Sequence, residues 1–112
     1  MKLPNLPLAQ VHREKIVGYL LSPTHRDGRH KHDFFIRFGF RPEAWEQLAD
    51  ALIQHASDYE VSSQQQTPFG VRYVIEGALR CPDGRRPLVR VVWFIDSEEE
   101  VPRLVTAYPL ER

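Results

Sequence analysis

The chain contains a single cysteine, Cys81, which excludes an internal disulfide and a cysteine-rich zinc site. Cys81 stands directly before a turn sequence, Pro82-Asp83-Gly84, where we expect an incidental loop thiol. No run of eighteen apolar residues occurs, and the apolar stretch at the start is too short and too rich in proline for a signal peptide. These absences predict a soluble, cytoplasmic protein with no membrane partner.

An excess of one charge is also missing, because 15 Lys and Arg residues are balanced by 15 Asp and Glu residues. Affinity for long nucleic acid grows with the number of phosphates that basic groups neutralise, so a protein that coats nucleic acid is disfavoured. A compact site for one or two phosphates stays open. The length of 112 residues and the hydrophobic content of 42% predict one globular domain, residues 1–112, with a single core.

The apolar residues have helical spacing in the first half of the chain and alternate in the second half. Helices are expected over residues 11–21, over 27–39 with Asp27 as the N-cap, and from Pro42 to about residue 56. Strands are expected over residues 71–80, 88–95 and 103–108. The predicted fold class is α+β, with two to three N-terminal helices packed on one face of a roughly four-stranded antiparallel sheet.

One predicted strand is apolar at nearly every position. It runs from Val89 to Ile95, and Arg90 is its exception. We therefore expect this strand to be central and covered on both faces. The aromatic residues are expected in the core; they are Trp45, Trp93, Phe34, Phe35 and Phe38.

Histidines and basic residues gather between Thr24 and Phe35, which holds three of the five histidines. If Asp27 caps the second helix, then Arg29, His30 and Lys31 occupy its first turn. Unpaired backbone N–H groups and the helix dipole favour an anion there. The arrangement is typical of a phosphate site, with His25 on the loop just before it.

Two histidines beside a phosphate suffice for RNA cleavage without a metal. One accepts the proton of the 2′-hydroxyl, the other protonates the leaving oxygen, and a cation stabilises the transition state. The simpler alternative for each histidine is an exposed or capping role. The candidate catalytic residues are His25, His30, Lys31 and Arg90, and the candidate substrate-binding residues are Arg29, Thr106 and Tyr108.

A metal site is the rival interpretation of the histidines, since His25, His30, His32 and Asp33 are all of ligating types. On a helix, however, His30 and His32 point about 200° apart and cannot grip one ion together. The sequence therefore predicts neither a metal nor a cofactor.

Three residues of the second half have functional and structural interpretations that both stay open. Arg90 either pairs with Glu76 or another carboxylate as a structural ion pair, or reaches the site on the sheet surface. Thr106 and Tyr108 share one face of the last strand, because they are two residues apart. Their hydroxyl groups either bind a phosphate or belong to the core.

Several segments resemble a bacterial family of small uncharacterised domains. They are Gly18–His25, Asp27–Lys31 with Phe34-Phe35, Thr67–Gly70, Val89–Trp93 and Pro102–Pro109. Members of this family occur alone and, in a related form, as C-terminal modules of polymorphic and contact-dependent toxins. The resemblance implies a fold like that of the RelE, barnase, EndoU and colicin-type ribonucleases, whose sheet face carries the RNA site without a metal.

The toxin motif maps onto individual positions of this chain. It falls on Pro23, His25, Gly28 and Lys31, and its strand elements fall on Arg90, Trp93, Thr106 and Tyr108. The chain departs from the motif at Arg26, where the pattern has proline, and at His32, where it has a small residue. The implied partners are RNA and a cognate antitoxin or immunity-type protein.

Three functions of different classes are consistent with the sequence. The first is a metal-independent endoribonuclease of toxin type. The second is a non-catalytic domain that binds a protein, for which the acidic loop Asp96–Glu100 is a natural contact for a basic partner. The third is an enzyme that acts on a nucleotide or an ADP-ribose-like ligand, because a phosphate site serves it equally well.

Overall fold

A computed structural model describes residues 1–110 of the chain. Helical elements come first: η1 (Leu6–Leu8), α1 (Arg13–Lys15), η2 (Ile16–Leu20), α2 (Arg29–Arg37), η3 (Pro42–Ala44) and α3 (Trp45–Asp58). Four strands follow: β1 (Ser63–Thr67), β2 (Gly70–Ala78), β3 (Leu88–Asp96) and β4 (Arg103–Pro109). No helix of this part of the chain has the length and apolar character that crossing a membrane requires.

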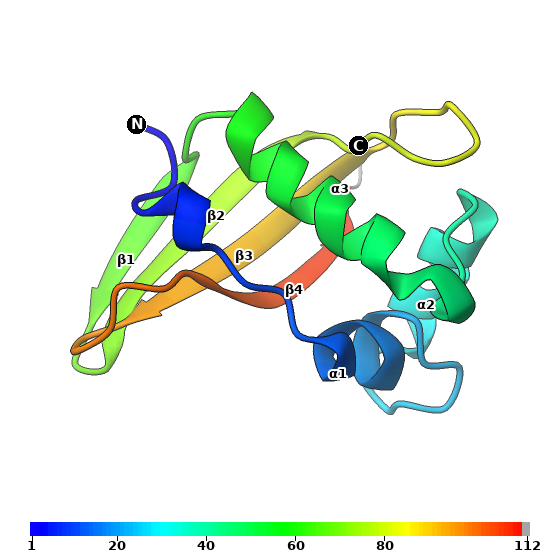
Figure 1. Cartoon of the computed structure of the whole chain (residues 1–112), viewed down its shortest axis with the longest axis horizontal. Helices are drawn as coiled ribbons and strands as arrows, with labels where there is room; N and C mark the ends of the chain where they lie inside the picture. The colour runs from blue at the N-terminus through cyan, green and yellow to red at the C-terminus, as the bar shows by residue number, and fades with distance from the viewer. Residues whose placement is uncertain (111–112) are drawn as a thin grey trace.

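The four strands form one antiparallel sheet in the order β1-β2-β3-β4, and α3 lies across one of its faces (Figure 1). At one end of the sheet α2 contacts β4 and η2. The α+β class and the arrangement of helices against the sheet are confirmed. The alternation of apolar residues does not predict strand β1, because every residue of Ser63–Thr67 is polar. The strand lies at the edge of the sheet and is largely exposed.

Helix α3 covers one face of the sheet (Figure 1). Val89, Val91 and Trp93 of β3 are fully buried in the core on that face. Arg90, Val92 and Phe94 alternate with them and point to the opposite face, where Val92 is fully buried while Arg90 and Phe94 keep part of their surface in solvent. The expectation that β3 is covered on both faces therefore holds at Val92 and is wrong at Arg90 and Phe94. Because Arg90 is partly exposed, it can carry charge there.

The first expected helix is divided into two short elements. Helix α1 covers one turn, and the chain then widens into the π-helix η2, where the N–H of Leu21 bonds to the carbonyl of Ile16 at 2.7 Å. Ile16, Leu20 and Leu21 are buried. The apolar spacing correctly predicts a buried helical face, but it does not indicate the wider turn of the π-helix.

Four of the five aromatic residues expected in the core contribute to it. Trp93 and Phe35 are fully buried, and Trp45 and Phe34 pack against the core cluster from partly exposed positions. Phe38 is only partly buried and, within the described residues, is outside this cluster; it contacts Phe34 with ring centroids 4.9 Å apart. These contacts hold α2 against the rest of the fold and fix where its first turn lies.

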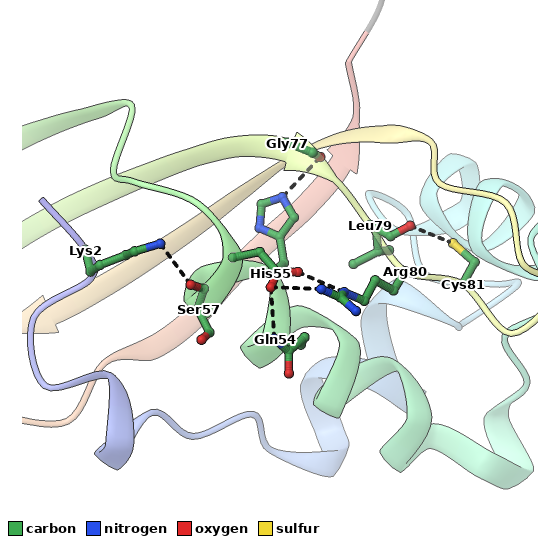
Figure 2. Close-up of polar contacts among 9 residues, drawn as sticks. Lys2, Gln54, His55, Ser57, Gly77, Leu79, Arg80 and Cys81 are labelled. Atoms are coloured by element: carbon green, nitrogen blue, oxygen red, sulfur yellow. Dashed lines mark hydrogen bonds and ion pairs between the residues drawn. The ribbon is translucent and has the colours of Figure 1, made fainter.

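His55 is a buried polar residue at the C-terminal end of α3. Its side chain is 1% exposed, and Nε2 donates a hydrogen bond to the carbonyl of Gly77 on β2 at 3.1 Å (Figure 2). Nδ1 is buried and has no hydrogen-bond partner among residues 1–110. Loss of water around the ring lowers the pKa of His55 below its ordinary value of 6.5, although Gly77 and Asp58 act in the opposite direction.

This buried histidine predicts acid sensitivity. Below about pH 6.5 the unfolded chain binds a proton at His55 that the folded chain does not, so the free energy of unfolding should fall as the pH drops toward the lowered pKa. Urea unfolding between pH 5 and 8 should show this slope, and His55→Gln should flatten it. Parallel pH profiles for the two proteins would contradict the assignment. His12→Gln, at an exposed histidine, is the control and should leave the slope unchanged.

Candidate functional site

The imidazole of His25 caps the turn that precedes α2. Its Nδ1 accepts hydrogen bonds from the backbone N–H of Asp27 at 3.0 Å and of Gly28 at 3.1 Å. The carbonyl of His25 accepts from the N–H of Gly28 and Arg29. Because Nδ1 is an acceptor for two donors, the neutral ring carries its proton on Nε2. His25 therefore offers a hydrogen-bond donor at Nε2 from a ring held in place by the backbone.

Asp27 does not cap α2. The N-cap residue is Gly28, and the side chain of Asp27 does not bond to the helix start. The N–H groups of Asp27, Gly28 and Arg29 are bonded to His25 and are not open to an anion. The expectation of Arg29, His30 and Lys31 in the first turn of α2 is confirmed.

Tyr19 of η2 brings together residues that are distant in sequence. Its ring meets the His25 ring edge-on, with centroids 5.0 Å apart and planes at 75°. The Nζ of Lys31 lies 5.4 Å from the centre of the same ring. At the other end, the hydroxyl of Tyr19 is hydrogen-bonded to Oγ1 of Thr106 at 2.9 Å. A single side chain thus links the loop before α2 to the last strand.

Lys31 is held from two sides. Its ammonium group donates a hydrogen bond to the carbonyl of Asp27 at 3.0 Å. Lys15 lies 5.2 Å from the Tyr19 ring centre, so this ring carries two ammonium groups within cation–π distance. Of the basic residues predicted to gather in this segment, Lys31 thus lies at Tyr19, where Lys15 of α1 joins it.

Gly28 sits against the backbone of Tyr19. A Cβ atom at this position would lie 2.1 Å from the carbonyl oxygen of Tyr19 and 2.9 Å from its carbonyl carbon. Only glycine permits so close an approach of the two backbones. This constraint explains the glycine of the motif, and it keeps His25 beside Tyr19.

A second polar cluster lies on the open face of the sheet. Strand register places Arg90 between Glu76 on β2 and Tyr108 on β4. Nε of Arg90 donates to Oε2 of Glu76 at 2.7 Å, and Nη1 donates to the hydroxyl of Tyr108 at 3.3 Å. The hydrogen bond to Tyr108, followed by that to Glu76, raises the pKa of Arg90 above its usual value. The guanidinium is therefore a permanent positive charge.

Arg90 and Tyr108 line two neighbouring hollows on this face. One measures about 170 Å³ and is bounded also by Ser63, Arg72, Val74 and Glu76. The other measures about 390 Å³ and extends to Pro109 and Leu110. Both guanidinium contacts of Glu76 fall on its Oε2 atom. Its Oε1 atom is thus the carboxylate oxygen with capacity to accept a hydrogen bond from a ligand.

Strand β4 connects the two clusters. Thr106 contacts Tyr19, and Tyr108 contacts Arg90. Residues two apart on a strand lie on the same face at a spacing of about 7 Å. The shared face of Thr106 and Tyr108, predicted from their spacing, agrees with their register opposite Val92 and Arg90.

Other predicted residues stand apart from these contacts. Arg29 and His30 are exposed on α2, and within residues 1–110 their side chains bond to none of the other candidates. His32 pairs with its neighbour Asp33 at 3.0 Å. Within the same described part of the chain, no group of three or more His, Cys, Asp and Glu residues is arranged to hold a metal ion.

Two residues of the clusters were not among the sequence candidates. Tyr19 is separated from Thr106 by 87 positions, and its local sequence gives no hint of that contact. The sequence predicts Glu76 only as a structural partner of Arg90, and the structure confirms this pairing. Its position beside a hollow follows from β2 pairing with β3, which a strand pattern alone does not specify.

A further hollow of about 410 Å³ lies away from both clusters, between α3 and the segment that follows β2. Cys81 lines it together with Arg80 and Phe40. Burial raises the pKa of the Cys81 thiol to about 11, so the group is protonated at neutral pH. This agrees with the expectation of an incidental thiol.

A family model described as a domain of unknown function, DUF6883, matches residues 2–111. The chain belongs to the DUF6883 family. No curated protein matches the sequence. The family assignment covers nearly the whole chain and agrees with the resemblance to small uncharacterised domains.

The DUF6883 domain also resembles a solved structure. One chain of a contact-dependent growth inhibition toxin–immunity protein complex from Klebsiella pneumoniae 342 superposes with a TM-score of 0.74. The match covers 96% of this chain and 97% of that chain at 16% sequence identity. At this identity the likeness establishes a shared fold.

The contact of Gly28 with Tyr19 predicts a sharp difference between two glycines of the DUF6883 domain. Gly28→Ala forces a methyl group against the Tyr19 carbonyl, and we expect the free energy of unfolding to fall by about 1–3 kcal/mol. Gly18→Ala is the matched control, because its Cβ would meet only Glu14, at 3.8 Å. It should be neutral or slightly stabilising. Equal stability of the two variants in urea unfolding would show that the close approach is not maintained.

Proposed function

We propose that this DUF6883 domain is a metal-independent endoribonuclease of contact-dependent toxin type, with one RNA phosphate bound between His25 and Arg90. The observation that carries the proposal is the connection along β4. Thr106 bonds to the Tyr19–His25 unit, and Tyr108, on the same strand face, bonds to Arg90. Strand β4 therefore contributes one residue to each of two clusters that carry anion-binding groups, and this supports the proposal.

The two clusters contain the types of side chain that RNA cleavage needs when the 2′-hydroxyl group attacks the adjacent phosphate. That reaction removes the 2′-hydroxyl proton, forms a bond from this oxygen to phosphorus, breaks the bond from phosphorus to the 5′-oxygen and leaves a 2′,3′-cyclic phosphate. In this proposal Glu76 accepts the 2′-hydroxyl proton at Oε1, and the departing 5′-oxygen takes a proton from solvent water. Nε2–H of His25 and the guanidinium of Arg90 bind the phosphate oxygens as negative charge develops.

The remaining candidates have supporting roles in this scheme. Lys31 adds positive charge beside His25, and the hydroxyl of Tyr108 supplies a further hydrogen bond next to Arg90. Thr106 positions Tyr19. Arg29 and His30, exposed on the first turn of α2, extend the basic surface toward neighbouring phosphates. An immunity-type protein that covers this surface would be the neutralising partner.

The proposal predicts that the purified domain cleaves RNA in the presence of EDTA. His25→Asn is the sharpest variant, because its amide oxygen can take the place of Nδ1 and accept from Asp27 and Gly28, while Nε2 is lost. We expect this variant to fold and its cleavage rate to drop by about 10²–10⁴-fold. Gel assays on a structured RNA, with urea unfolding in parallel, provide the measurement.

Variants of the second cluster complete the test. Arg90→Gln should lower the rate comparably, and Glu76→Gln should abolish proton acceptance while keeping a hydrogen bond to Arg90. His32→Ala, outside both clusters, is the control and should retain the wild-type rate. Wild-type cleavage by folded His25→Asn and Arg90→Gln proteins would refute the site. Absence of any cleavage by the wild-type protein across cellular RNA would refute the activity.

A further inference from the structure

Phe69 is an aromatic residue held out in solvent. It lies in the turn between β1 and β2, and its side chain is 77% exposed. The turn is nonetheless firmly bonded: Oγ1 of Thr67 accepts from the N–H of Phe69 and of Gly70, each at 3.1 Å. The carbonyl of Phe69 accepts from the N–H of Ser97 on the β3–β4 turn at 2.9 Å. Its exposure is therefore a fixed feature of the surface, and little ordering would be lost on binding a partner.

Carboxylates surround Phe69. A hollow of about 350 Å³ is bounded by Pro68, Phe69, Asp96, Ser97, Glu98 and Glu99. Asp96 is paired with Arg103 at 3.0 Å. Within residues 1–110 the salt bridges do not include Glu98, Glu99 or Glu100. The notch beside the phenyl ring thus carries negative charge that this part of the chain does not neutralise.

The same domain contains two examples of an arginine that stacks on a phenylalanine and pairs with an adjacent carboxylate. Arg103 lies 5.1 Å from the centre of the Phe94 ring and is bonded to Asp96. Arg85 lies 4.2 Å from the centre of the Phe38 ring, and its Nε donates to Asp83 at 2.7 Å. Phe69 with Glu98 and Glu99 repeats this combination of an aromatic face and carboxylates.

We propose that the Phe69 notch, formed by Pro68, Phe69, Ser97, Glu98 and Glu99, is a docking surface for an arginine-bearing basic segment of a partner protein. The guanidinium stacks on Phe69 and bonds to the carboxylates of Glu98 and Glu99. Arginine fits better than lysine, because its planar group stacks on a ring and bonds to carboxylates at the same time.

Charge selects a protein as the partner. Three successive glutamates at 98–100 repel the phosphates of a nucleic acid and attract a basic polypeptide. The notch lies on the turns joining β1 to β2 and β3 to β4, whereas Tyr19 and His25 belong to the segment before α2, near the opposite end of the elongated domain (Figure 1). The docking surface is therefore independent of the proposed nuclease site.

Nuclear magnetic resonance titration of the full chain tests the surface directly. The probe is a capped pentapeptide with two arginines separated by glycines, compared with its lysine counterpart. We expect the arginine peptide to shift backbone amide signals of residues 67–70 and 96–100, and the lysine peptide to bind several-fold more weakly. Phe69→Ala should weaken binding of the arginine peptide about fivefold, the fold-change expected for loss of one exposed cation–π contact.

Matched variants separate this notch from general acidity. Glu98→Gln combined with Glu99→Gln should remove the shifts, while Glu43→Gln combined with Glu46→Gln, at exposed acidic positions before and within α3, should retain them. Leu8→Ala, at another exposed apolar residue, is the control for Phe69→Ala. Equal effects of the two double variants, equal binding of the two peptides, or the same shifts with a short RNA at the same concentration would overturn the proposal.

Discussion

The pairing of β3 with β2 on one side and β4 on the other determines where the remaining groups of the domain lie. The buried residues of β3, which include Trp93, form the apolar surface on which the helices pack. The same strand directs Arg90 to the opposite face, between Glu76 and Tyr108. One alternating strand thus supplies the hydrophobic support of the fold and a fixed positive charge on its surface.

The helical half adds the second set of functional groups by packing at the β4 edge. Gly28 allows two backbone segments to touch, and this contact places the His25 ring against Tyr19. The hydroxyl of Tyr19 then reaches Thr106. The site therefore depends on a small residue and a hydroxyl pair as much as on the charged groups, and the charged groups alone would not be brought near the sheet.

Patterns in the sequence predict those parts of the structure that follow from local periodicity or composition. The α+β class and most of the core aromatics are of this kind, whereas the pairing of Arg90 with Glu76 depends on the register between β2 and β3. The polar strand β1 lacks the alternation that identifies a strand. Asp27 is not the N-cap of α2, and the turn before that helix is held by the imidazole of His25, which bonds the N–H groups of Asp27 and Gly28. The contact of Tyr19 with Thr106 joins the two ends of the chain, and no local pattern encodes it. The chemical roles of His25, Lys31, Arg90 and Tyr108 stay predictions.

The strand order β1-β2-β3-β4 has a consequence for how the chain reaches its fold. Every neighbour in the sheet is also the next strand in sequence, so each pairing closes only the loop between consecutive strands. No strand has to be inserted between two others that have already paired. The sheet can therefore form by successive hairpins, with β1 added beside β2 and β4 added beside β3. A fully unfolded chain needs no insertion of a strand between paired strands when it refolds.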